Sequence, residues 1–330
     1  MKIVVDAMGG DHAPAAVIAG VVDALKTYDI NIALIGIKDR VEQELKAWKY
    51  PKDRIEVIHA PEVVEMHDPA TASIRKKRNS SITLGLELIK DPAYNAFISA
   101  GNTGAVVAAA TVNLGMIPGV ERPAIGLTIP TLKDLAFLID VGANTDPKPE
   151  HLMQWALMAG VYVREVMGVA NPGIGLLNIG EEAVKGTDFV KDTHKLLSEH
   201  LPNFIGNIEA NEVYTGKCEC IICDGFVGNV VLKVSEGLAE SATKLIKREV
   251  QKNPLAILGA LLMKPALRNV KRISDYSEYG GAPLLGVKGI VMISHGRSSP
   301  KAIKNAIRKT MQEIEHNIIE CMTREIGAKA

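Results

Sequence analysis

The sequence predicts an α/β fold with three layers, in which helices cover both faces of a mostly parallel sheet. Strand-like and helix-like segments alternate over most of the 330 residues, which is typical of parallel sheets with helical crossovers. Several strand segments are continuous apolar runs, as expected for strands covered on both faces. Of all residues, 47% are apolar but only 4% are aromatic, so we expect a core of mainly aliphatic side chains.

The expected elements follow from these runs in chain order. The first strand is favoured because Ile3, Val4 and Val5 are apolar and β-branched. The last helix places Ile303, Ile307 and three further apolar residues on one stripe, with charges elsewhere. Strands are predicted over 2–6, 31–36, 54–59, 95–99, 123–129, 135–141, 174–179, 204–209, 218–223 and 287–294. Helices are predicted over 14–27, 39–48, 80–90, 103–115, 149–167, 187–199, 226–252 and 299–325.

The chain is long enough for one large α/β domain or two lobes. Residues 241–274 break the alternation of strands and helices. We therefore predict an α/β core over 1–240 and 275–330, with a helical hairpin excursion over 241–274. No internal repeat or low-complexity linker divides the chain.

Composition excludes several classes of protein. Lys plus Arg equals Asp plus Glu, at 38 each, which argues against a nucleic-acid protein held by a global basic field, although local patches remain possible. Met1 and Lys2 lead straight into a strand that contains Asp6, unlike a signal peptide. No apolar run reaches the roughly 18 residues that a membrane span needs. Four cysteines in a chain of 330 residues do not indicate a disulfide framework. Together these observations lead us to expect a cytoplasmic protein.

Small and polar residues follow many of the strands. These loops read DAMGGDHAP (6–14), SAGNTGA (99–105), DVGAN (140–144), NIGEEAVKG (178–186), CDGFVGN (223–229) and SHGRSS (294–299). In an open parallel sheet the loops after the strands gather at one edge, where ligands bind. Glycines let backbone N–H groups approach a ligand, and helix N-termini favour anions. The loops therefore predict an anion site, with phosphate as the expected anion; the alternative is a set of ordinary capped strand–helix turns.

Several familiar motifs are absent. The sequence contains no G-x-G-x-x-G, no G-x-x-x-x-G-K-[ST] and no G-x-S-x-G, which disfavours dinucleotide, P-loop and serine hydrolase sites. Cys218, Cys220 and Cys223 are close in sequence, but no second knuckle is present to complete a zinc site. In a strand Cys218 and Cys220 would share a face, and we interpret all three as small buried hydrophobes. We expect neither a metal nor a cofactor.

The loop motifs together resemble one family. MGGDHAP, SAGNTGA, RPA (122–124), DVGAN, PEH (149–151), GLLNIGEE followed by KG, DGFVGN, YGGAPLLGVKG (279–289) and SHG are similar to the motifs of bacterial acyl-ACP:phosphate acyltransferases. They occur in the order of that family from residue 6 to residue 296, so the resemblance covers nearly the whole chain.

The resemblance implies a reaction, a fold and partners. Inorganic phosphate would attack the thioester of a fatty acyl group on acyl carrier protein, giving an acyl phosphate for phospholipid synthesis. A membrane glycerol-3-phosphate acyltransferase would use that product. The fold would be similar to phosphotransacetylase and the isopropylmalate dehydrogenase group. The protein would form homodimers and associate peripherally with the inner face of the cell membrane.

This chemistry asks little of a general base, because phosphate is already a nucleophile and a thiolate leaves readily. It requires positioning and stabilisation of an oxyanion. We expect phosphate to bind among Gly9, Gly10, Asn102, Thr103 and Gly104. The catalytic candidates are Lys185, His12, Asn229 and Asp224.

Each catalytic candidate has an alternative interpretation. Lys185, the best candidate for charge compensation, could be a solvated loop lysine, and His12 could merely neighbour a helix cap. Asp6, Asp140 and Asp224 end strands in a similar way; they orient Lys185 or His12, or they cap loops, and we favour capping for Asp140. The basic run RKKR (75–78) suits docking of the acidic carrier protein, although a solvated charge run is the alternative.

The excursion suggests contact with a membrane surface. LAILGALLM (255–263) is too short to span a bilayer. It is flanked by eight basic residues, Lys244, Lys247, Arg248, Lys252, Lys264, Arg268, Lys271 and Arg272. An apolar tip with basic flanks suits an anionic bilayer, and we expect Leu255, Leu258, Leu261 and Leu262 to enter it. A core or dimer helix is the alternative.

Two other functions compete with the phosphate acyltransferase. One is an enzyme that uses coenzyme A, such as a phosphotransacetylase. The other is a non-catalytic membrane scaffold, which would need the apolar tip but neither Lys185 nor the glycine loops.

Overall fold

The computed structural model describes residues 1–274, 278 and 280–328. Within these residues one mixed sheet has the strand order β3-β2-β1-β4-β11-β10-β5-β6-β9-β7-β8. The strands are β1 (Lys2–Asp6), β2 (Asn31–Gly36), β3 (Ile55–His59), β4 (Ala96–Ser99), β5 (Ala124–Pro130), β6 (Leu135–Ile139), β7 (Ile174–Asn178), β8 (Phe204–Glu209), β9 (Cys220–Ile222), β10 (Ala282–Leu285) and β11 (Ile290–Ile293).

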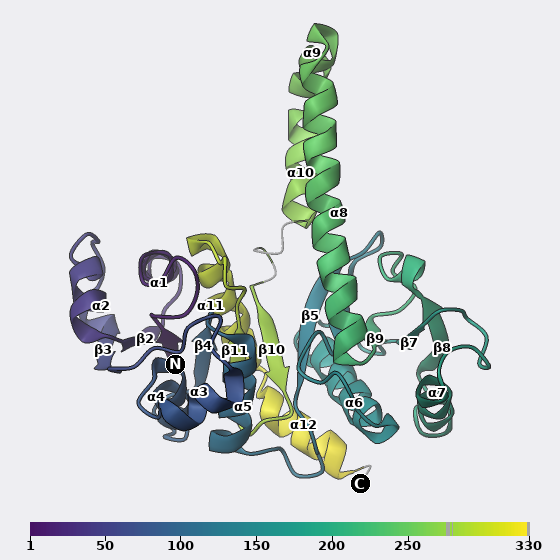
Figure 1. Ribbon diagram of the computed structural model, residues 1–330, viewed down its shortest axis with the longest axis horizontal. Coiled ribbons are helices and arrows are strands. Elements are labelled where there is room, and N and C mark those ends of the chain that lie inside the picture. The colour runs from purple at the N-terminus through teal and green to yellow at the C-terminus, as the bar shows by residue number, and fades with distance from the viewer. Residues whose placement is uncertain (275–277, 279, 329–330) are drawn as a thin grey trace.

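Helices cover both faces of this sheet (Figure 1). They are α1 (Ala15–Leu25), α2 (Lys38–Leu45), α3 (Ala70–Lys76), α4 (Ser81–Leu88), α5 (Thr103–Leu114), α6 (Pro149–Glu165), α7 (Asp188–His200), α8 (Gly225–Gln251), α9 (Pro254–Leu262), α10 (Lys264–Ser274), α11 (Pro300–Glu315) and α12 (Ile318–Gly327). The predicted three-layer α/β fold is therefore confirmed.

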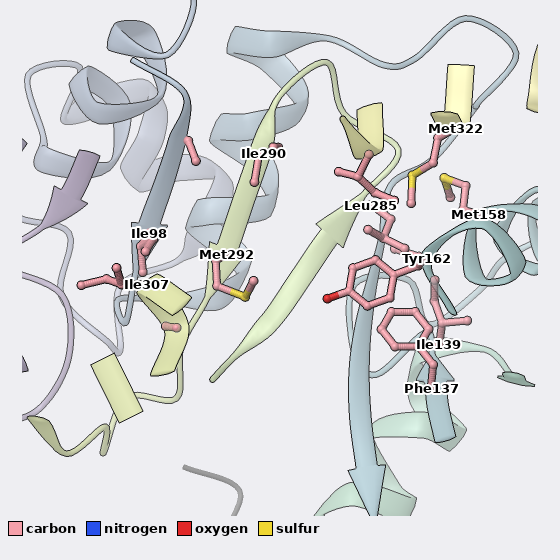
Figure 2. Packing of buried hydrophobic residues seen from close by; sticks show 14 of the residues in the cluster. Ile98, Phe137, Ile139, Met158, Tyr162, Leu285, Ile290, Met292, Ile307 and Met322 are labelled. Carbon is pink, nitrogen blue, oxygen red and sulfur yellow. The ribbon is translucent and has the colours of Figure 1, made fainter. Parts of the chain in front are cut away.

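Alternation along the strands divides the core into two clusters. Ile3 and Val5 belong to the cluster that includes residues of α1, α2, α6, α7, α11 and α12, whereas Val4 belongs to the cluster that includes residues of α4 and α5 on the other face. Aliphatic side chains dominate both clusters. One aromatic pair adds to the first cluster: Phe137 of β6 stacks on Tyr162 of α6, with ring centroids 4.4 Å apart (Figure 2).

Two antiparallel strands in the middle of the sheet change its direction. β10 runs antiparallel to both β11 and β5, and β5 runs antiparallel to β6. All other pairs are parallel. The strands β1, β4 and β11 consequently run opposite to β6, β7 and β9. The prediction that all six loops gather at one edge is wrong: three loops leave one end of the ladder and three leave the other.

Three local predictions also differ from the structure. The segment 282–285 forms β10, which sequence reasoning left without a strand, and the strand after it is only Ile290–Ile293. The helix expected over 299–325 is two helices, because Asn317 adopts a left-handed conformation with φ +48°. Asparagine tolerates this conformation better than most residues. Helix α3 was not expected.

Helices α8, α9 and α10 form a hairpin that projects far beyond the sheet (Figure 1). α8 has 27 residues, which corresponds to about 40 Å, and it begins at the sheet and continues through residue 241 without a break. The expected excursion therefore starts inside a continuous helix, and its expected end at residue 274 is the last residue of α10. No helix among the described residues is both long enough and apolar enough to span a bilayer.

Candidate functional site

The loops after β1 and β4 are joined by buried polar groups. The Asp6 carboxylate is buried and accepts hydrogen bonds from the Ser99 hydroxyl at 2.8 Å and the Met8 N–H at 3.0 Å. The Ser99 hydroxyl in turn accepts the Gly101 N–H at 3.0 Å. Burial raises the pKa of Asp6, and its hydrogen bonds oppose that rise. Asp6 therefore fastens the exits of the two strands to each other.

Gly9 and Gly10 are required by the close packing of these loops. A Cβ on Gly9 would lie 2.6 Å from the backbone nitrogen of Gly101. Gly10 has φ +101°, and a Cβ there would lie 2.9 Å from the Gly296 carbonyl oxygen in the loop after β11. That carbonyl also accepts the Asp11 N–H at 2.8 Å. The loops after β1, β4 and β11 thus form one packed set, which we call the first loop group (residues 6–12, 99–104 and 294–297).

The start of helix α5 lies in the first loop group. Asn102 is its N-cap: the side-chain oxygen accepts the Ala105 N–H at 3.0 Å, and the amide nitrogen donates to the Asp68 carbonyl at 3.0 Å. Both ends of this side chain are thus engaged within the protein. Among the described residues, no acceptor pairs with the N–H groups of Thr103 and Gly104, so this end of the helix is open to an anion.

The second loop group follows β6, β7 and β9 (residues 140–144, 178–186 and 223–229). Its centre is Asp140, which is fully buried. The carboxylate accepts N–H groups of Ile125, Gly142, Ala143 and Asn144 at 2.7–3.1 Å, and also the Asn144 side-chain amide at 3.0 Å. Burial raises the pKa of Asp140, and these hydrogen bonds oppose the rise. The prediction that Asp140 caps its loop is confirmed.

Asp224 and Asn229 lie at the start of α8. The Asp224 carboxylate caps the helix by accepting the Val227 N–H at 2.9 Å. Asn229 is exposed and faces the loop after β6, because a Cβ on Gly142 would lie 3.7 Å from the Asn229 side chain. Asp224 thus has a structural task, whereas the amide of Asn229 stands beside the loop of Asp140.

Lys185 lies in the loop after β7. Its N–H donates to the Glu182 carbonyl at 3.0 Å, and its carbonyl accepts the Asn178 side-chain amide at 3.1 Å. The Lys185 side chain is exposed, and no carboxylate among the described residues forms an ion pair with it. Ile179 and Val184 of the same loop are 81% and 77% exposed. The loop therefore presents one cation and two apolar side chains at the surface.

Helix α8 connects the two loop groups. Lys233 lies one helical turn after Asn229, which belongs to the second group. Lys233 and Glu236 both act electrostatically on His295, which belongs to the first group. Burial lowers the pKa of the half-buried His295, the Glu236 carboxylate opposes this, and the Lys233 ammonium adds to it. Sequence reasoning missed Lys233, although its spacing of four residues from Asn229 places both on one helix face.

His12 lies at the rim of the first loop group. Its side chain is exposed, and its carbonyl accepts the Ala16 N–H at 3.0 Å as helix α1 begins. The structure thus leaves the imidazole accessible and agrees equally with a binding role and with a position beside a helix start.

The basic run RKKR (75–78) is only partly a free charge cluster. The Lys77 ammonium is tied inward, to the Asp68 carboxylate at 2.6 Å and the Val63 carbonyl at 2.8 Å. Arg75, Lys76 and Arg78 are exposed. Three cations of the four therefore remain at the surface.

Cys218, Cys220 and Cys223 are buried, as predicted. Burial raises the pKa of Cys218 to about 12, and raises those of Cys220 and Cys223 as well. The expectation that Cys218 and Cys220 share a face is wrong, since β9 begins at Cys220 and Cys218 packs in the same core cluster as Cys223. Among the described residues no group of three or more His, Cys, Asp or Glu is placed to hold a metal.

The fold is that of the phosphotransacetylases. EutD phosphotransacetylase from Staphylococcus aureus superposes with a TM-score of 0.61 at 16% identity, covering 95% of this chain and 94% of that one. A phosphotransacetylase from Streptococcus pyogenes gives a TM-score of 0.62 at 17% identity, with 96% and 94% covered. At this level of identity the likeness defines the fold.

Sequence similarity defines the family. The model of a family described as "Fatty acid synthesis protein" matches residues 1–321. "Phosphate acyltransferase" from Alkaliphilus oremlandii is 46% identical over 328 residues, covering 99% of this chain and 98% of the relative. That of Halothermothrix orenii is 45% identical over 330 residues, with 99% of each covered. The chain therefore belongs to the phosphate acyltransferase family, and the family predicted from the loop motifs is confirmed.

Proposed function

We propose that this protein transfers a fatty acyl group from acyl carrier protein to inorganic phosphate. The observation that carries the proposal is the similarity to phosphate acyltransferases over 99% of the chain. A phosphate oxygen forms a bond to the thioester carbonyl carbon, and the carbon–sulfur bond then breaks. The thiolate leaves with the carrier and takes up a proton from solvent. The products are an acyl phosphate and the free carrier thiol.

Phosphate is assigned to the first loop group. The N–H groups of Thr103 and Gly104 at the open end of α5 suit an anion. Gly9 and Gly10 bring further backbone close to this end, since Gly9 packs against Gly101. Asn102 acts through its cap on α5. In this assignment His12, at the rim, donates a hydrogen bond to phosphate or to the developing oxyanion.

Lys185 and Asn229 are assigned to the negative charge that develops on the thioester oxygen. Lys185 supports this role because its ammonium is exposed and unpaired among the described residues. Asn229 offers a side-chain amide on the face of α8 that leads to Lys233. Asp224 positions Asn229 by capping α8. The two loop groups lie at opposite ends of the strands of the sheet, and helix α8 links them. In this assignment the substrates therefore meet along α8.

Acyl carrier protein is the proposed donor, and its docking surface includes the exposed Arg75, Lys76 and Arg78. Helix α3 carries the first two, and this helix packs against α5. A strongly acidic partner would be steered toward these cations and held near the open end of α5. Lys77 is excluded from this surface by its bond to Asp68.

The hairpin tip is the proposed contact with the inner face of the cell membrane. Leu255, Leu258, Leu261 and Leu262 are 56–77% exposed. The cations Lys247, Lys264 and Arg268 flank this tip; the side chains of Lys271 and Arg272 lie outside the described residues. Apolar residues within a basic frame favour an anionic bilayer. A cytoplasmic enzyme bound there would deliver its acyl phosphate to a membrane glycerol-3-phosphate acyltransferase.

A second copy of the chain is the proposed occupant of an apolar stripe along α8. The stripe consists of Phe226, Val230, Val234, Leu238 and Leu245, each 44–68% exposed. Spacings of four and seven residues place them on one face of the helix, and the stripe leads directly to the apolar tip. Since soluble oligomers are most commonly two-fold dimers, pairing of two α8 helices would cover both stripes and bring the two tips to one membrane.

The test is phosphate-dependent release of free thiol from palmitoyl-acyl carrier protein, measured beside palmitoyl-coenzyme A. The proposal expects rapid release from the carrier protein and none without phosphate. Release from the coenzyme A thioester alone would favour a phosphotransacetylase-like enzyme instead. No release from either donor would favour the membrane scaffold.

A further inference from the structure

A cavity of about 370 Å³ lies away from both loop groups. It is bounded by the turn between β5 and β6, the C-terminal end of α6, the segment before β9, and helix α11. The turn joins β5 to the start of β6, which is the opposite end of that strand from Asp140. Helices α6 and α11 belong to the core cluster on the face opposite α5. The cavity is therefore separate from the site proposed for phosphate.

Lys309 lines this cavity and is almost completely buried. The residue is 8% exposed, yet among the described residues no carboxylate forms an ion pair with its ammonium, and no acceptor forms a hydrogen bond with it. The ammonium lies 5.7 Å from the centre of the Tyr162 ring. The buried Glu313 carboxylate acts electrostatically on Lys309 but accepts its hydrogen bond from the Tyr162 hydroxyl, at 3.0 Å. Burial without a partner is costly for a charged group.

The rest of the cavity wall is partly charged and partly apolar. Arg308 and Lys133 add positive charge beside Lys309. Three carboxylates line the cavity. Asp134 accepts the Leu135 N–H at 2.9 Å, Glu219 accepts the Gly173 N–H at 2.7 Å, and Glu278 is paired with Lys301 at 2.7 Å. The apolar part of the wall consists of Leu135, Val166, Met167 and Val169. The cavity thus combines a buried, unpaired cation with an aliphatic surface.

We propose that this cavity binds a small amphiphilic anion, whose carboxylate or phosphate pairs with Lys309. Its apolar portion would lie against Val166 and Met167. The ligand would supply the direct ion pair that Lys309 does not form with any of the described residues. The cavity volume falls within the usual range of small-molecule sites, about 300–1,000 Å³. The site does not depend on the acyl-transfer chemistry proposed above.

Isothermal titration of the full-length protein with octyl phosphate, octanoate and inorganic phosphate tests the proposal. The variants are Lys309→Met, which keeps the aliphatic stem, and Met167→Trp, which fills the cavity without removing charge. Lys195→Met, an exposed lysine of α7, is the control. Octyl phosphate or octanoate should bind the wild type and the control, and each cavity variant should lose that site or weaken it at least about tenfold.

The three probes distinguish a phosphate head group from a carboxylate head group. The cavity variants distinguish binding at this cavity from binding at the site proposed for catalysis. Stronger binding of octyl phosphate than octanoate would identify a phosphate head group, and the reverse a carboxylate. Binding of inorganic phosphate that survives in Lys309→Met belongs to another site. Equal binding of the amphiphilic probes by wild type and both cavity variants would overturn the proposal, as would no binding of them by the wild type.

Discussion

Buried carboxylates perform three different tasks at the level of single residues. Asp6 joins two loops through a serine, and Asp140 gathers the N–H groups of its own loop. Glu313 is buried against Tyr162 and near Lys309, with no loop to organise. Burial raises the pKa of Glu313 to about 8. This residue therefore makes the stability of the protein depend on pH near neutrality.

We expect Glu313→Gln to reduce that dependence. Between its ordinary pKa of 4.5 and about 8, the folded protein keeps a proton on Glu313 that the unfolded chain releases. Its contribution to stability is therefore present below pH 4.5 and is lost as pH rises through about 8, with a slope of at most about 1.4 kcal/mol per pH unit. Urea unfolding over this range should show a shallower loss in the variant. Equal slopes in both proteins would contradict the assignment.

Lys185 is the residue on which the proposed chemistry depends most. Lys185→Ala should lower the rate of phosphate-dependent thiol release at least about tenfold, because an exposed cation is removed from the developing charge. Its melting temperature should stay close to that of the wild type, since the Lys185 backbone carries the bonds that hold the loop. Lys195→Ala serves as the matched control. An unchanged rate in Lys185→Ala would remove this residue from the mechanism.

Helix α8 is the element that determines the geometry of the site. Its first turn borders the loop of Asp140, its middle faces His295, and its far end carries the apolar tip. One rigid helix therefore links catalytic candidates to the proposed membrane contact. The start of this helix depends on the cap formed by Asp224.

Two substitutions separate capping by Asp224 from catalysis. Asp224→Ala should lower the free energy of unfolding by about 1 kcal/mol. Asp224→Ser should have a free energy of unfolding close to that of the wild type, because serine also caps helices. If the cap is the task of Asp224, the serine variant keeps nearly full activity. A large loss of activity in a stable Asp224→Ser protein would instead assign a chemical role to the carboxylate.

At the scale of the whole molecule, the α8 stripe and the hairpin tip are exposed apolar surfaces that follow one another along the projecting helices. The tip prediction is tested by the double variant Leu258→Glu and Leu262→Glu, which places acids in an anionic bilayer. It should no longer sediment with anionic vesicles and should retain activity on soluble acyl carrier protein. Continued vesicle binding would show that the tip is not the membrane contact.

The stripe prediction concerns assembly. Val234→Glu should shift the protein toward monomer in sedimentation equilibrium at micromolar concentration, because a carboxylate would face the partner helix. Glu236→Gln, two residues away and on a different face of α8, is the control and should leave the distribution unchanged. A wild-type protein that is monomeric under these conditions would exclude the α8 dimer.

The local sequence predicted most elements of this fold and the residue types of its loops. Continuous aliphatic runs identified β1, β2 and β4, and the long uninterrupted helix after Asp224 was expected nearly to its ends. The short β10 was missed because Ala-Pro-Leu-Leu has no strand pattern of its own. Its place depends on pairing with β5 and β11. The break at Asn317 was missed because the apolar stripe continues across it.

The sequence by itself determined the family, the three-layer class and the glycine-rich loops, because each depends on local residue order. Tertiary structure alone decided that these loops form two groups, since the polarity of the sheet reverses at β10 and β5 through long-range pairing. It also separated capping residues such as Asn102 and Asp224 from exposed ones such as Lys185. A side chain's partners depend on which distant backbone groups reach it, and local sequence does not encode that.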